Sequence, residues 1–150
     1  MANETKWTYA SQVTLESTGG ATATNAFEQA DVTTLASGNH SNYPWADFVL
    51  KTVGHAANVG SNGSINLYRQ DLNMDGTAGD AAAPAAANPV QLVASFRVPD
   101  AQTSNATTYY SAVEVPLAAD CAVWIENKTS QALVAGWTLK VTPKTYAPGA

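Results

Sequence analysis

The chain has 150 residues, of which 45% are hydrophobic and 13% charged, and its formal net charge is −5. This length favours one domain, with enough apolar residues to bury a core without disulfides. An acidic chain without a cluster of Lys and Arg would be repelled by phosphate backbones, which argues against nucleic acid as a partner.

No stretch of the sequence has the pattern of a leader peptide or a membrane anchor. Residues 1–11, MANETKWTYAS, lack a basic start and an apolar run, and no apolar stretch approaches the length that crosses a bilayer. We therefore expect a soluble protein made in the cytoplasm, with no membrane partner. The only cysteine, Cys121, excludes an internal disulfide and is expected to be a small buried residue on a strand.

Apolar and polar residues alternate along most of the chain, with the period that places one face of a β-strand in a core and the other in water. In chain order, this pattern predicts strands at residues 7–17, 27–37, 45–53, 64–71, 90–98, 110–117, 121–126 and 137–142. No segment has convincing helical spacing. The sequence therefore predicts an all-β, single-domain jelly-roll sandwich of about eight antiparallel strands.

The segments between these strands predict how the strands pair. Residues 58–63 are rich in Gly and Asn, so the strands on either side are expected to form a hairpin. A compact polar turn at 127–131 separates two of the last three strands, which predicts one antiparallel unit over 110–142.

The alternation also assigns side chains to faces. We expect three sets of residues to face the core: Leu92, Ala94, Phe96 and Val98; Val113, Val115 and Leu117; and Trp137, Leu139 and Val141.

Residues 73–89 form the one low-complexity segment, NMDGTAGDAAAPAAANP. Its two prolines and two glycines argue against a helix, so we expect a long exposed loop. A loop of this length inside a compact domain is usually functional or mobile.

The start of this loop has the D-x-N-x-D-G spacing of a calcium site at Asp71, Asn73 and Asp75. The position that should supply the closing bidentate acid is Ala82, and Asp80 could replace it only in a different geometry. We therefore predict an acidic loop, without metal or other cofactor, in which these three residues and Asp80 are the weak candidates for ligands.

The sequence offers no constellation of catalytic residues. His40 and His55 have no further His or Cys at ligand spacing and are expected at the surface or at strand ends. Glycosidases need two carboxylates that face each other across a cleft. Glu114 and Glu126 could be cross-strand neighbours, but each fits the polar face of its own strand. The serines lie mostly in turns and lack a nucleophile elbow. We predict that the chain is not an enzyme.

Three aromatic residues are predicted to form an interface. Trp124 lies opposite the apolar face of its strand and is therefore expected to be exposed or covered by a partner. Residues 1–6 and 145–150 are expected to be short arms that fray on a free monomer and become ordered on a neighbour. Trp7 and Tyr146 are the innermost large aromatics of the two ends and would anchor the arms.

Residues 115–146, VPLAADCAVWIENKTSQALVAGWTLKVTPKTY, resemble the C-terminal half of the small jelly-roll decoration, or cement, proteins of tailed-bacteriophage capsids. The resemblance covers about residues 63–146 and rests on a strand-turn-strand cadence that ends in GWTLKVTPKTY. It implies a non-enzymatic virion protein, made in the host cytoplasm, that decorates the outer surface of the capsid and stabilises it by bridging major capsid protein subunits. A homodimer or homotrimer is implied, because such proteins sit at symmetry axes.

The alternative is a carbohydrate-binding or receptor-binding β-sandwich of a virion, in a head fibre or a tail-associated domain. Such a module would present Trp and Tyr on an open face or in its loops.

Overall fold

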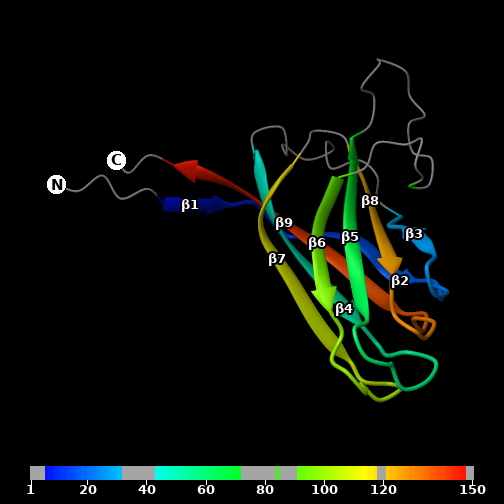
Figure 1. Ribbon diagram of the computed structural model, residues 1–150. Coiled ribbons are helices and arrows are strands. Elements are labelled where there is room, and N and C mark those ends of the chain that lie inside the picture. Colours follow the sequence, from blue (N-terminus) through cyan, green and yellow to red (C-terminus); the bar gives the residue numbers. More distant parts are fainter. Residues whose placement is uncertain (1–5, 32–42, 72–83, 85–90, 118–120, 148–150) are drawn as a thin grey trace.

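The computed structural model describes residues 6–31, 43–71, 84, 91–117 and 121–147, which form strands and connections without a helix. Nine strands build two antiparallel sheets, of five and four strands (Figure 1). Their bounds are β1 Lys6–Tyr9, β2 Val13–Gly19, β3 Phe27–Gln29, β4 Trp45–Thr52, β5 Ser64–Asp71, β6 Gln91–Arg97, β7 Thr108–Pro116, β8 Cys121–Asn127 and β9 Trp137–Ala147.

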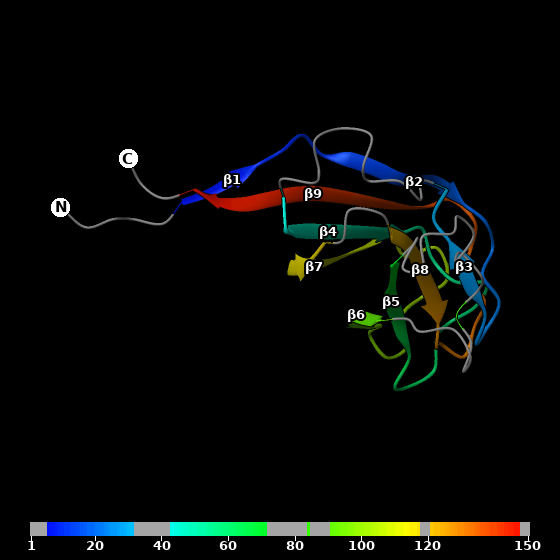
Figure 2. The ribbon, with the colours of Figure 1, turned by 90° about the horizontal axis from the view of Figure 1, so that it is seen from above.

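The order of the strands is that of a jelly roll. One sheet runs β1-β9-β4-β7, with β2 also paired to β9, and the other runs β3-β8-β5-β6. From β2 onward the chain changes sheet at every connection except β5 to β6, and the sheets face each other as a sandwich (Figure 2). The predicted fold class is confirmed. The ninth strand arises because the predicted strand over 7–17 is divided into β1 and β2.

Two predicted pairings are wrong. β4 and β5 lie in different sheets, so residues 58–63 belong to a connection between the sheets and not to a hairpin turn. Likewise β8 lies in the four-stranded sheet while β7 and β9 both pair with β4, so these three strands are not one antiparallel unit. Alternation reports which face of a strand is buried, and it carries no information about which sheet the strand joins.

The core fills the space between the sheets and is centred on Trp137, the largest fully buried side chain. Its indole Nε1 donates a hydrogen bond of 3.0 Å to the carbonyl oxygen of Gly20. A Cβ added to Gly19 would overlap the indole ring, so this strand end must be glycine. Leu139 and Val141 are buried beside Trp137 as predicted, and so is Cys121.

A β-bulge in β7 reverses the predicted face of one valine. Val113 and Glu114 of β7 both lie opposite Asp47 of β4, where the ladder shifts register. Glu114 takes a φ of 57°, and its N–H donates to Asp47 Oδ1 at 2.9 Å. The additional residue turns Val113 outward, where it is 66% exposed, while Ala112 packs against the core.

A second bulge has the same effect in β6. Leu67 faces Ala94 and Tyr68 faces Leu92, so Val93 is the additional residue. Leu92 is consequently 53% exposed, and Val93 packs against the core in its place. Beyond the bulge the prediction is confirmed, because Phe96 and Val98 are buried.

Candidate interaction surface

β1 and the last residues of β9 form a two-stranded ribbon that extends beyond the two sheets (Figures 1 and 2). The ladder pairs Trp7 with Tyr146 and Tyr9 with Lys144. Because β4 pairs with β9 only as far as Lys144, residues 145–147 pair with β1 alone. The ribbon thus consists of residues 6–9 and 144–147.

The ribbon contains the described part of the two predicted arms, residues 6 and 145–147. Lys6 and residues 145–147 lie in strands, and the rings of Trp7 and Tyr146 stack on each other with centroids 3.7 Å apart. These two aromatics are predicted to anchor the arms on a neighbouring subunit. In the structure they contact each other and hold β1 and the end of β9 together. The remainder of the predicted arms, 1–5 and 148–150, lies outside the described residues.

Pro143 does not end β9, although a proline usually breaks a ladder. Its carbonyl oxygen accepts a hydrogen bond of 2.8 Å from the N–H of Ala10, which lies between β1 and β2. In an antiparallel ladder the N–H and C=O of a residue point to the same neighbouring strand. The missing N–H of Pro143 thus falls at the break between β1 and β2, so the strand continues into the ribbon at little cost.

A buried lysine fastens the ribbon to the sandwich. The side chain of Lys144 is 4% exposed, and its Nζ lies 2.6 Å from Asp47 Oδ1 on β4. The same ammonium lies 4.2 Å from the ring centroid of Trp7 and 5.9 Å from that of Tyr9. Aromatic faces and a carboxylate thus replace the water that this charge would otherwise hold.

The ribbon presents aromatic surface and open strand edges. Tyr9 is 53% and Tyr146 49% exposed, a large share for side chains of this size. Within the described residues, β1 pairs only with β9, so its other edge offers unpaired backbone groups. Open edges of this kind can accept a strand from another chain.

The third predicted interface residue, Trp124, is not exposed for contact with a partner as Tyr146 is. It lies on β8 in the four-stranded sheet and is only 7% exposed within the chain itself. Its Nε1 donates a hydrogen bond of 3.1 Å to Gln70 Oε1 on β5. The expectation that Trp124 is exposed or needs a partner to cover it is therefore wrong.

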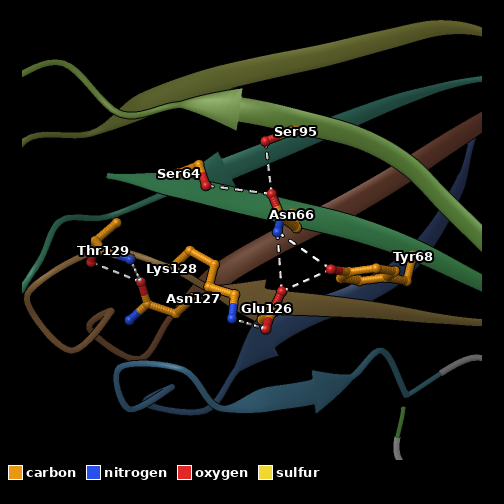
Figure 3. A network of polar contacts seen from close by, with 8 residues as sticks. All are labelled: Ser64, Asn66, Tyr68, Ser95, Glu126, Asn127, Lys128 and Thr129. Atoms are coloured by element: carbon orange, nitrogen blue, oxygen red, sulfur yellow. Dashed lines mark hydrogen bonds and ion pairs between the residues drawn. The ribbon is translucent and has the colours of Figure 1, made fainter. Parts of the chain in front are cut away.

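Beside Trp124, Glu126 is the centre of a polar network on the four-stranded sheet (Figure 3). Its carboxylate accepts hydrogen bonds from Tyr68 at 2.8 Å and from Asn66 at 3.0 Å, and pairs with Lys128 at 2.8 Å. Burial alone would raise the pKa of Glu126, but these partners, Lys128 foremost, outweigh burial and lower the pKa below its ordinary value. The carboxylate is therefore ionised and fully engaged, which suits a structural role better than proton transfer.

The neighbouring residue, Asn127, organises the polar turn at 127–131 (Figure 3). Its Oδ1 accepts from the N–H and hydroxyl of Thr129, and its Nδ2 donates to the carbonyl oxygens of Thr22 and Gln131. The amide is fully buried, and these partners satisfy both of its ends.

The structure does not bring the predicted acid pair together. Glu114 lies in β7 of the five-stranded sheet and Glu126 in β8 of the four-stranded sheet, so they are not cross-strand neighbours. His55 also departs from its prediction: it is fully buried, and neither ring nitrogen has a hydrogen-bond partner among the described residues. Burial lowers the pKa of His55 below 6.5. His40 lies outside the described residues.

Of the four weak metal candidates, only Asp71 is described. Its carboxylate pairs with Arg69 at 2.9 Å, while Asn73, Asp75 and Asp80 lie in the part of the chain that is not described. The described residues contain no group of three or more His, Cys, Asp or Glu side chains that could hold a metal ion. They also contain no helix long and apolar enough to span a bilayer.

Comparison of the chain with protein-family models, with curated proteins and with solved structures found no match.

Sequence reasoning missed three residues whose contacts hold the ribbon in place: Tyr9, Asp47 and Lys144. A signal for them existed, because Lys144 and Tyr146 continue the alternation of Thr138, Lys140 and Thr142. Pro143 obscured this signal, because a proline inside an alternating run argues against a continuous strand. Whether the strand tolerates the proline depends on whether a neighbouring strand needs the missing N–H, which the sequence does not show.

Proposed function

We propose that this chain is a non-enzymatic structural protein that decorates the outer surface of a tailed-phage capsid and stabilises it by bridging major capsid protein subunits. The observation that carries the proposal is the ribbon, a projecting strand pair with exposed Tyr9 and Tyr146 and an edge that no other described strand covers. The resemblance of residues 115–146 to capsid decoration proteins supplies the identity of the partner.

The ribbon suits a bridging role because it is ordered before it binds. The Trp7–Tyr146 stack and the Lys144–Asp47 pair already fix its side chains, so less conformational freedom is lost on docking than with a frayed arm. Burial of exposed tyrosines then contributes directly to binding, and aromatic residues carry a large share of interface energy. The open edge of β1 can add hydrogen bonds to a strand of the capsid subunit.

The proposal includes a small homo-oligomer, a homodimer or homotrimer. A protein that occupies a symmetry axis of a shell meets copies of itself there, and closed symmetry is the usual arrangement of such copies. Sedimentation of the purified chain, alone and on heads, measures this directly.

The test of the proposal is co-sedimentation of the intact chain with purified, expanded phage heads. We expect saturable binding to heads and none to detached tails. Failure to bind heads, or equal binding to tails and heads, would refute the capsid role.

A further inference from the structure

A shallow groove of about 410 Å³ lies on the outer face of the five-stranded sheet, away from the core. Residues from four strands or their flanks line it: Gln12, Val49, Lys51, Tyr109, Thr138 and Lys140. The ladders place Lys140 opposite Val49, and Lys51 between Thr138 on β9 and Tyr109 on β7. The groove is therefore floored by regular sheet, which holds these side chains at fixed spacings.

The groove brings together two of the few positive charges of an acidic chain. Seven Lys and Arg residues occur in all, and four of them form ion pairs: Arg69, Arg97, Lys128 and Lys144. Lys51 and Lys140 form no ion pair with any described residue. Asp47, an acidic residue on the same face of β4 as Lys51, is already paired with Lys144.

Lys51 and Lys140 occupy diagonal positions on adjacent strands, which are roughly 7–8 Å apart, so their positive charges repel each other. A bound anion would relieve that repulsion and gain two charge-assisted hydrogen bonds.

The other residues that line the groove are not typical of a site for a simple anion. The ring of Tyr109 is 67% exposed at one side of the groove, and Gln12 and Thr138 add an amide and a hydroxyl. A flat ring beside hydrogen-bonding groups suits a ligand with an apolar face and many hydroxyls. The volume is also within the range of small-ligand sites.

A peptide is the weaker fit. Peptides that bind sheets pair with the backbone of an edge strand, whereas this groove lies on a sheet face and offers side chains alone.

We propose that this groove binds a carboxylate-bearing saccharide. Lys51 and Lys140 bind the carboxylate, Tyr109 packs against the sugar ring, and Gln12 and Thr138 bond to hydroxyls. The site shares no residue with the ribbon, so it does not depend on the capsid role.

The test is calorimetric titration of the intact chain with saccharides in matched pairs: oligogalacturonate against neutral oligogalactan, and sialyllactose against lactose. We expect the acidic saccharide of at least one pair to bind at least about tenfold more tightly than its neutral partner. Added salt should weaken that binding. Lys51→Gln, Lys140→Gln and Tyr109→Ala should each weaken binding about tenfold. Lys140→Arg should retain it.

The matched control is Arg97→Gln, which removes one exposed positive charge from the other sheet and should leave binding unchanged. Three results would overturn the proposal: no acidic saccharide binds, the neutral partner binds equally well, or the groove variants bind like the parent. Tighter binding of polyglutamate or inorganic phosphate than of any saccharide would also overturn it, by assigning the groove to an acidic protein or a simple anion.

Discussion

At the scale of single residues, the core depends on how Trp137 is enclosed. The indole is fully buried, its N–H is satisfied by Gly20, and the absence of a side chain at Gly19 makes room for the ring. Removing the ring leaves a cavity that the surrounding strands cannot close, because their ladders fix the backbone on both sides.

We expect Trp137→Ala to lower the free energy of unfolding by about 3–5 kcal/mol. Chemical denaturation measures this, with Tyr109→Ala as a control at an aromatic that is 67% exposed. The control should change stability by less than about 0.5 kcal/mol. Similar losses in the two variants would mean that Trp137 is not the centre of the core.

His55 should make stability depend on pH. Its folded-state pKa is lowered by burial, and the unfolded value is about 6.5. Above pH 6.5 both states hold a neutral imidazole. As the pH falls below 6.5, the unfolded chain binds a proton that the folded chain excludes, so the free energy of unfolding decreases until the folded-state pKa is reached.

Unfolding measured from pH 7.5 to 5.5 tests this, a window above the ordinary pKa of the carboxylates. We expect the parent to lose stability across the window and His55→Leu to lose less. An equal slope in both would show that another group is responsible.

The alternation predicted correctly which side chains face the core where the ladders are regular, and it was wrong at the bulges. Trp137 and Phe96 follow the alternation of their strands. Val113 lies in a bulge and Leu92 directly precedes one, so neither does. Alternation within one strand cannot show that two of its residues lie opposite a single residue of the neighbouring strand.

At the scale of elements, one ion pair fastens the ribbon to the sandwich. Lys144 is nearly inaccessible to water, so its charge is tolerated because Asp47 and two aromatic rings surround it. Asp47 also accepts the N–H of Glu114 at the β7 bulge. One carboxylate therefore joins β4, β7 and the ribbon, a role that no sequence pattern around Asp47 indicates.

We expect Asp47→Asn to destabilise the fold by about 1–3 kcal/mol, because it leaves a buried ammonium without its counter-charge. Backbone amides of β1 should also exchange hydrogen faster. The matched control is Asp100→Asn, which breaks an exposed pair with Arg97 and should cost less than about 0.5 kcal/mol. If the two variants behave alike, Lys144 does not fasten the ribbon.

At the scale of the whole molecule, composition and alternation indicated an all-β sandwich or barrel, because both depend only on strands with one buried face, and the number of strands together with the resemblance favoured a jelly roll. They could not predict which strands share a sheet, since β4 and β5 are adjacent in sequence yet lie in opposite sheets. The ribbon was not predicted for a related reason: its two strands lie far apart in the sequence, and alternation within each strand does not show that they pair with each other.

We propose that the ribbon is the element that binds the capsid. The most direct measurement is the affinity for expanded heads of a variant lacking residues 145–150, which removes Tyr146 and the part of β9 paired with β1 alone. We predict that its sandwich stays folded and that its affinity falls at least about tenfold, while Tyr109→Ala binds like the parent. Full-strength binding by the truncated, folded variant would contradict it.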